Sequence, residues 1–316
     1  MSGESRSLAL RYFREFVNKH DLSVLRELCS PQRLDHDFTE ELSPAPEYAQ
    51  QRHRNLGNVF SDVHDDIEAM VATDDMVAVR VLGTGIHSGE LFGVPATGKQ
   101  VTWTATMIWR ISDGKFVERW NAFDSLSQML QLDTLPALKH VVIPAQHKHM
   151  PLQSDEESSK DQTTEDTQGQ LKPLWQFLEA LRTGNLAILE DVVAPEYIDH
   201  GGWIDGLPAG SQGLQQEVMI LRRAFPDLEI TVQQLFAAEK YAVLMMKGAG
   251  TQRGEFFGIP ATNKHTSWIS VGIYRVEQGK IMERWIDATR LPLLRQLGVI
   301  PPVPMEVLPI LRPETF

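Results

Sequence analysis

Two acidic residues near the ends of two similar segments are the first candidates for chemistry. Asp124 lies four residues after Trp120, and Asp287 lies two residues after Trp285. A carboxylate in an apolar cavity has a raised pKa, and it can then exchange protons with a carbon acid near neutral pH. Both residues follow predicted strands rich in apolar and aromatic side chains. The sequence therefore points to acid–base chemistry on a small molecule.

The two carboxylates do not occupy the same position of the strand. Alternate residues of a strand share a face, so Ala122 and Asp124 would point one way, and Asp287 and Thr289 are the matching pair. The first copy thus has a small residue (Ala122) where the second has an acidic one (Asp287), and an acidic residue (Asp124) where the second has Thr289. We hypothesise two cavities that hold a carboxylate at different depths. Structural interpretations stay open: Asp124 could cap the apparent helix that follows it, and Asp287 could be exposed or paired with a neighbouring arginine.

Histidines and tryptophans could complete such cavities. His36 and His200 each follow an aspartate, and His87 lies in a glycine-rich segment where the second copy has Gln252. These histidines could position or polarise a substrate, or they could be structural or surface residues. The tryptophans that would form the core or the cavity wall are Trp103, Trp109, Trp120, Trp268 and Trp285. Glu118 and Glu283 are predicted to pair with neighbouring basic side chains.

The composition excludes several other classes of function. A net charge of −12 argues against a nucleic-acid surface. No window reaches the roughly 18 apolar residues of a membrane span. The histidines at 140, 147 and 149 match no strong metal-site spacing, so we predict no metal. The single cysteine, Cys29, is read as a buried thiol in a reducing compartment, and without a signal-like N-terminus we expect a cytoplasmic protein.

The segments that carry these residues are copies of each other. Residues 90–124 match 255–289 without a gap, at an offset of 165 residues, and residues 8–36 match 172–200 at an offset of 164. A period of this length is a duplicated domain. We predict a first domain over 1–136, an acidic flexible linker over 137–171, a second domain over 172–300 and a proline-rich tail over 301–316 that packs on a domain surface or a partner.

Each copy begins with helical spacing and ends with strand alternation. A helix breaks near residue 18 or 184, a short helix follows over 22–28 or 186–192, and a third helix is clear only over 214–225. About four antiparallel strands come next, with hairpin turns at 113–114 and 278–279. Helices followed by strands indicate the α+β class.

A set of motifs now points to a family. These are Asp35-His36 and Asp199-His200, the stretch AFPDLEITV at 224–232, the run GTGIHSGE…FGVPATGK at 83–99, and the closing GK…ERW…D at 114–124 with GK…ERW…QLG at 279–298. With them each repeat resembles the SnoaL-like polyketide cyclases, which share a small α+β cone with ketosteroid isomerases and nuclear-transport-factor-like proteins. The resemblance spans nearly the whole chain apart from the linker and the tail.

The resemblance implies two tandem cone-shaped domains, each with about three helices packed on a curved antiparallel sheet. The family's cyclases close a ring by aldol condensation of a methyl-ester substrate, without metal or Schiff base, and an aspartate of the last strand is their acid/base. By motif that residue is Asp124, with His36 and His87 lining its pocket. In the second repeat Thr289 stands there, which departs from the pattern.

We therefore expect cofactor-free acid/base catalysis, an aldol cyclisation or an isomerisation, on an apolar, possibly aromatic carbonyl compound. The alternative is a small-molecule-binding protein without catalysis, and in both cases the cones would pair as an intramolecular pseudo-dimer or as a homodimer. The expected catalytic residues are Asp124, His36 and His87. The expected pocket residues are Trp103, Trp120, His200, Trp268, Trp285, Asp287 and Thr289.

Overall fold

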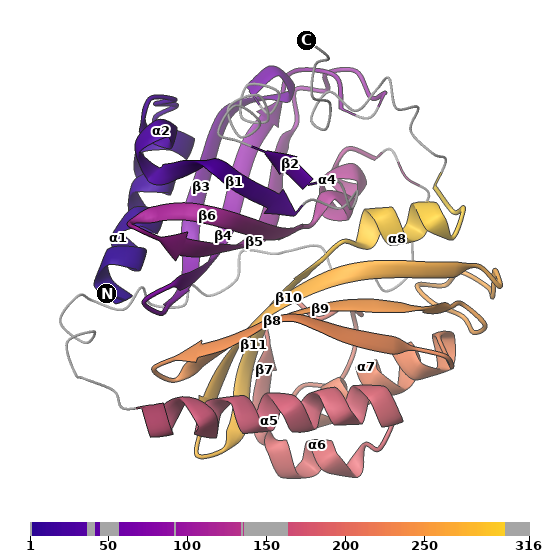
Figure 1. The fold of residues 1–316 in the computed structure, drawn as a ribbon. Coiled ribbons are helices and arrows are strands. Elements are labelled where there is room, and N and C mark those ends of the chain that lie inside the picture. The colour runs from indigo at the N-terminus through magenta and orange to yellow at the C-terminus, as the bar shows by residue number, and fades with distance from the viewer. Residues whose placement is uncertain are drawn as a thin grey trace.

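The computed structural model describes residues 2–36, 42–44, 57–91, 93–133, 135 and 164–300. The tail over 301–316, most of the predicted linker and the three histidines at 140, 147 and 149 lie outside these residues. The described part contains two α+β domains, which follow one another along the chain (Figure 1).

The described part of domain 1 begins with helices. Two strands, helical residues at 57–59, four further strands and one short helix follow. In chain order the elements are α1 (Ser2–Arg11), η1 (Tyr12–Val17), α2 (Val24–Leu28), β1 (Cys29–His36), β2 (Leu42–Pro44), β3 (Phe60–Ala72), β4 (Met76–His87), β5 (Gln100–Ser112), β6 (Lys115–Phe123) and α4 (Ser125–Gln131).

Domain 2 repeats this order with a clear third helix. Its elements are α5 (Thr164–Thr183), α6 (Ala187–Val192), β7 (Val193–Asp199), α7 (Ser211–Ala224), β8 (Glu229–Ala238), β9 (Tyr241–Thr251), β10 (His265–Glu277), β11 (Lys280–Ala288) and α8 (Arg290–Gln296). Helix α5 begins eight residues before the predicted boundary at residue 172. The polar composition of that stretch predicts a linker, but its residues extend the helix by about two turns.

The sheets contain strands that the sequence did not predict, β1 and β2 in domain 1 and β7 in domain 2. The sheet orders are β2-β1-β6-β5-β4-β3 and β7-β11-β10-β9-β8, and β1 and β7 run parallel to β6 and β11. Pro31 and Pro195 were expected only to end the short helices. Instead the chain continues as a strand, and its pairing shifts register across the proline, which has no N–H for the ladder.

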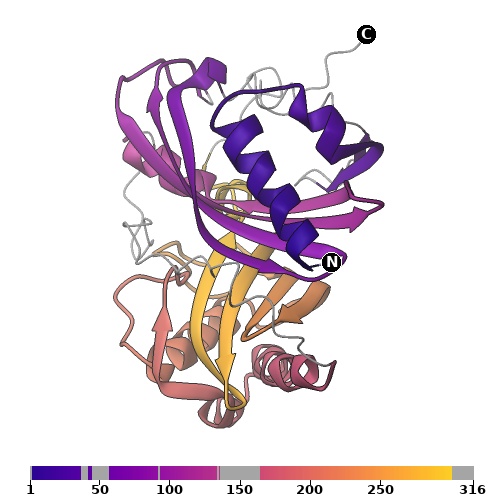
Figure 2. The ribbon, with the colours of Figure 1, turned by 90° about the vertical axis from the view of Figure 1, so that its left-hand side faces the viewer.

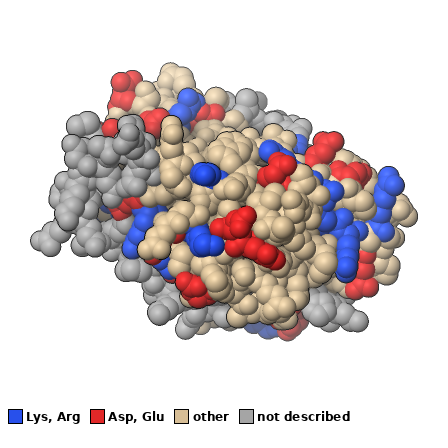
Figure 3. All heavy atoms as spheres, turned by 90° about the horizontal axis from the view of Figure 1, so that it is seen from below, with Lys and Arg blue, Asp and Glu red and all other residues tan. Residues whose placement is uncertain are grey.

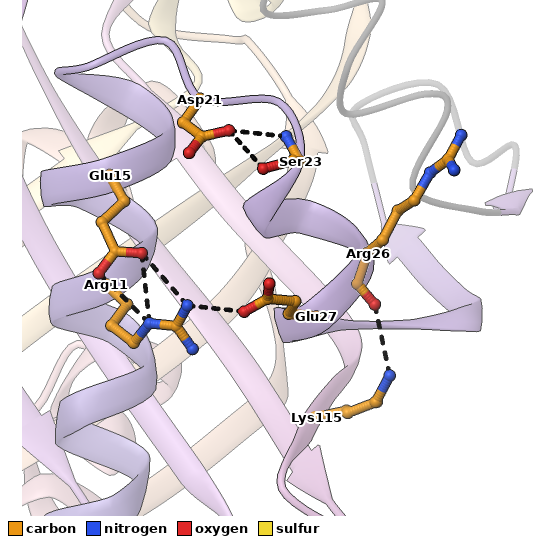
Figure 4. A network of polar contacts seen from close by, with 7 residues as sticks. All are labelled: Arg11, Glu15, Asp21, Ser23, Arg26, Glu27 and Lys115. Atoms are coloured by element: carbon orange, nitrogen blue, oxygen red, sulfur yellow. Dashed lines mark hydrogen bonds and ion pairs between the residues drawn. The ribbon is translucent and has the colours of Figure 1, made fainter.

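The helices of domain 1 are tied together on their outer surface by polar contacts (Figure 4). Arg11 donates to Glu15 in the next turn and to Glu27 of α2, with a distance of 2.8 Å from Nη2 to the Glu27 carboxylate. Lys115 donates to the backbone carbonyl of Arg26 at 3.4 Å. These contacts are exposed, so they contribute little stability each and mainly fix how the helices lie against the sheet.

Both sheets are curved, and each has one face covered by its own helices (Figures 1 and 2). In domain 1 the N-terminal helices pack on this inner face of the sheet. The strand residues of that core alternate along β4 and β5 and are Val77, Val79, Val81, Ala105, Met107 and Trp109. Further along the same strands the alternation places Gly83, His87 and Trp103 on the inner face as well.

The opposite, outer faces of the two sheets pack against each other. One buried apolar cluster joins them, with residues from both domains. Its members occupy equivalent positions in the two repeats: Met76 and Tyr241, Ala78 and Val243, Ile108 and Ile273, and Trp120 and Trp285. Helices α4 and α8 also contact each other across the domains. The two cones therefore form an approximately two-fold pair within one chain.

The face of the molecule seen from below carries both signs of charge. Figure 3 shows acidic and basic side chains interspersed among neutral ones on this face. A nucleic-acid surface would instead gather basic side chains. No helix in the described part of the chain is long and apolar enough to cross a membrane.

Candidate functional site

Asp124 lies in the contact between the domains. It is 2 % exposed and caps helix α4, where its Oδ1 accepts a hydrogen bond from the Ser127 backbone N–H at 3.4 Å. Its Oδ2 accepts from the Ser127 hydroxyl and, at 2.5 Å, from Nη2 of Arg290 at the start of α8. The N-cap interpretation is confirmed.

Asp287 also lies in this contact, not at the surface and not inside a cone. It is 3 % exposed, and its two carboxylate oxygens accept hydrogen bonds at 2.5 Å from Thr104 and Thr106 of domain 1. Arg80 of domain 1 places its Nε 3.2 Å from Asp287 Oδ2 and also pairs with Glu68. The interpretation of Asp287 as an exposed residue is therefore wrong. Arg284, one of the two neighbouring arginines that were candidates for its partner, pairs with Asp199 and Glu217 instead.

The hollow between the domains is small and charged. Its volume is about 20 Å³, and its lining includes Arg80, Asp124, Asp287 and Arg290. This is room for about one water molecule. The expectation of two apolar cavities with a carboxylate at different depths is not met, because the strand face that carries Ala122, Asp124 and Asp287 is the outer face of each sheet.

His36 and His200 take equivalent places at the edge of the outer faces. His36 stacks on Trp120 at a centroid distance of 4.8 Å, and its Nε2 lies 2.6 Å from Oε1 of Glu118. His200 stacks in the same way on Trp285. The two glutamates also pair with Arg110 and Arg275, which confirms the predicted basic partners (Glu118 with Arg110, Glu283 with Arg275).

The inner face of domain 1 carries a carboxylate that the sequence reading did not single out. Asp65 of β3 pairs in register with Gly83, and a Cβ at Gly83 would meet both the indole Nε1 of Trp103 and Oδ1 of Asp65. Oδ1 is buried beside the indole of Trp103, and no described residue donates to it with full hydrogen-bond geometry. Burial raises the pKa of Asp65 to about 6, although His64 and the indole of Trp103 lower it in part.

His87 lies further along the same inner face. Phe60 connects it to Trp103, with ring centroids 5.2 Å from Trp103 and 5.7 Å from His87. Asp65, Trp103, Phe60 and His87 thus form a row, with Asp65 at one end and His87 at the other. The backbone N–H of Thr97 donates to Nδ1 of His87, so Nε2 carries the proton of the neutral ring. Nε2 is buried and has no partner among the described residues. Burial lowers the pKa of His87, which keeps the ring neutral.

Domain 2 has no such row. The residues equivalent to Asp65 and His87 are Ile230 and Gln252. The Gln252 side chain is fully engaged, because its amide donates to three carbonyls of the neighbouring loop and its oxygen accepts from Thr262. Trp203 packs on Trp268 with centroids 5.7 Å apart, and the remaining hollow holds about 20 Å³. Domain 2 fills its cone with its own side chains.

One buried carboxylate inside domain 2 is satisfied by protein groups. Glu217 of α7 accepts from Arg284 at 2.8 Å and from the backbone N–H of Trp203 at 3.0 Å. Burial raises the pKa of Glu217, although Arg284 lowers it in part. With Asp199 as the second partner of Arg284, these groups form a buried structural ion cluster.

The predicted site residues thus separate into two places. Trp103 and His87 line the domain 1 cone, and Trp268 lines the domain 2 cone. The other predicted residues lie on the outer faces of the sheets or in the domain contact; they are His36, Trp120, Asp124, His200, Trp285, Asp287 and Thr289. The hydroxyl of Thr289 accepts a hydrogen bond from the Ile269 backbone N–H at 3.0 Å. Asp65 was missed because its strand is polar at that point. Its signal is an acidic residue in the cone of one repeat where the other has isoleucine.

Among the described residues no cluster of histidine, cysteine, aspartate and glutamate has the arrangement of a metal site. Cys29 is buried, as expected.

Comparisons with known proteins agree with the duplicated architecture. A family model described as SnoaL-like polyketide cyclase matches residues 7–132 and 173–297. Among solved structures, TsrD from Streptomyces laurentii is 25% identical, covers 44% of this chain and 100% of its own, and has a TM-score of 0.40. AclR from Streptomyces galilaeus is 26% identical over 43% of this chain and 100% of its own, with a TM-score of 0.40. A search of curated proteins found no match.

Proposed function

Since the chain belongs to the SnoaL-like polyketide cyclase family, we propose that its first cone is a cofactor-free acid/base catalyst and that its second cone is a structural partner. The observation that carries this proposal is the difference between the two interiors. Domain 1 holds a half-buried carboxylate with one buried oxygen and a buried neutral imidazole, whereas the equivalent residues of domain 2 are Ile230 and an engaged Gln252.

Asp65 is the proposed acid/base group. A carboxyl with a pKa of about 6 is close to the working pH, so it can take a proton from a carbon next to a carbonyl and return it to another atom. Asp65 could thus form and quench an enolate, the step that aldol cyclisation and isomerisation share. The N–H at Nε2 of His87, at the other end of the row, would donate a hydrogen bond to a second polar group of the substrate and fix its orientation.

The spacing of the two groups indicates the size of the substrate. Gly83, opposite Asp65, and His87 are four residues apart on β4, which is about 13 Å along a strand. The wall between them is aromatic, formed by Phe60 and Trp103. We therefore infer an apolar carbonyl compound of several rings, which would contact both ends of the row and stack on the aromatic wall.

Asp124, the residue indicated by the family motif, competes for the same role. Its ion pair with Arg290 and its cap of α4 favour a structural role. The experiment is hydrogen–deuterium exchange at the α-carbon of 2-tetralone, an enolisable apolar ketone, followed by NMR in D2O. We expect Asp65→Asn to lower the exchange rate catalysed by the folded protein about 100-fold or more, and Asp124→Asn to leave it unchanged.

The same assay separates the alternatives. Loss of exchange in Asp124→Asn with full exchange in Asp65→Asn would return the role to Asp124. Binding of 2-tetralone by the wild-type protein without any exchange would favour a non-catalytic binding protein. The control is Ile230→Val, a mild change at the equivalent position in the cone of domain 2, which should leave the exchange rate unchanged.

A further inference from the structure

The contact between the domains uses equivalent positions, but its two halves differ in chemistry. In an exact two-fold contact each residue pair would occur twice. Here one half is polar: Asp287 of domain 2 meets Arg80, Thr104 and Thr106 of domain 1. The two-fold related half is apolar, because Ala122 stands where the other repeat has Asp287.

The residues that face Asp287 and Ala122 across the contact differ in the same way, polar in one half and apolar in the other. The counterparts of Arg80, Thr104 and Thr106 in domain 2 are Met245, Ile269 and Val271. Met245 and Val271 are buried in the same apolar cluster as Ala122, and Ile269 packs against it. A carboxylate therefore faces an arginine and two hydroxyls in one half, and a methyl group faces aliphatic side chains in the other.

The helix ends show the same asymmetry. Asp124 before α4 pairs with Arg290 of α8 across the contact at 2.5 Å, and both side chains are at most 8% exposed. The counterparts of these residues are Thr289 and Ser125, which are neutral. The charged groups of the contact thus meet their partners only when one domain 1 packs against one domain 2.

We propose that this polar asymmetry makes the outer sheet faces specific for each other: domain 1 binds domain 2, and neither domain binds a second copy of itself. A pair of two first domains would bury two copies of Asp124 without Arg290, and two copies of Arg80 that keep Glu68 but lack Asp287. A pair of two second domains would bury two copies of Asp287 against Met245, Ile269 and Val271. In both like pairs the buried charges lack the partners that the unlike pair provides.

The size of the effect follows from the burial of the charges. Arg80 and Asp287 have side chains 1% exposed, so neither can regain its hydration while the faces stay together. Leaving one member of a buried ion pair without its partner disfavours a state by a factor of about 100 or more. Since each like pair would leave several such groups, unlike pairs should exceed like pairs by at least this factor.

The first experiment counts the pairs directly. A protease site is placed in the full chain between residues 137 and 163, the folded protein is cut there, and the two domains are unfolded in urea, refolded together and examined by native mass spectrometry. We expect the unlike pair almost alone. Like pairs at their statistical half of the total would overturn the proposal. A variant with Glu68→Gln, Arg80→Met and Asp287→Ala, which removes the polar half, should raise the like pairs at least tenfold.

The second experiment uses the intact chain and needs no refolding of separate domains. Asp287→Ala is compared with Asp287→Ala combined with Ala122→Asp, which keeps the wild-type composition but moves the carboxylate to the apolar half. We expect the double variant to unfold at a lower urea concentration than Asp287→Ala alone, because the moved carboxylate faces Met245 and Val271. Recovery of the wild-type midpoint would show that the two halves are interchangeable and would overturn the proposal.

Discussion

Removing the carboxylate of Asp287 should loosen the domain contact more than any comparable surface change. In Asp287→Ala the hydroxyls of Thr104 and Thr106 lose a charged acceptor, and Arg80 keeps only Glu68 as a partner. A hydrogen bond to a charged group contributes roughly 1.5–3 kcal/mol. The adjacent hollow of about 20 Å³ can admit a water that recovers part of this. The expected loss of unfolding free energy is therefore about 3 kcal/mol.

The assay is urea unfolding followed by tryptophan fluorescence, because Trp120 and Trp285 are buried in the domain contact and change environment when it opens. With a slope of about 3 kcal/mol per molar urea for a chain of this size, the midpoint should fall by roughly 1 M. The midpoint of Asp287→Asn should lie between those of the wild type and Asp287→Ala, because the amide oxygen can still accept from one threonine but carries no charge for Arg80.

The matched control is Asp191→Ala, the same change at an exposed side chain. Its unfolding free energy should stay within about 0.5 kcal/mol of the wild type. A midpoint for Asp287→Ala equal to that of Asp191→Ala would refute the reasoning, since the carboxylate would then not be held between the domains.

Three further outcomes are expected. Arg290→Met should lower the unfolding free energy by about 3 kcal/mol, because it leaves Asp124 buried without its cation; an unchanged urea midpoint would contradict this. In the wild type the folded state binds the Asp65 proton more tightly than the unfolded state, so stability should fall as pH rises from about 4 to 6. Asp65→Asn should remove that fall, which amounts to about 3 kcal/mol. Because burial lowers the pKa of His87, stability should also fall as pH drops below about 6.5, and His87→Gln should abolish that part of the profile in pH-dependent urea titrations.

The fold class could be predicted from the sequence because the duplication presents the same order of helices and strands in two different amino-acid sequences. The helical spacing and strand alternation in the second repeat made up for a polar stretch in the first, and the hairpin turns lie where expected. The parallel strands β1 and β7 escaped because each contains a proline close to a helix end, which is read as a stop signal. Their pairing with β6 and β11 is a long-range contact that no local pattern encodes.

The position of the carboxylates could not be predicted in the same way. Strand alternation correctly puts Ala122 and Asp124 on one face, but it does not say whether that face turns toward the helices or toward another sheet. An interior ligand cavity and a sheet-to-sheet contact demand the same alternation of apolar residues. Asp287 is buried in both interpretations, and only the contact with Thr104 and Thr106 separates them.

Fusion of two cones in one chain explains why the two halves could diverge. In a homodimer every substitution at a two-fold contact appears twice, so a new buried carboxylate would need its cation in both halves at once. In the fused chain Asp287 and Arg80 can arise in one half alone, while Ala122 and Met245 keep the other half apolar. Once the contact no longer depends on identical domains, the interiors are also free to differ. Domain 2 can then close its cone with Trp203 while domain 1 keeps titratable groups on its inner face.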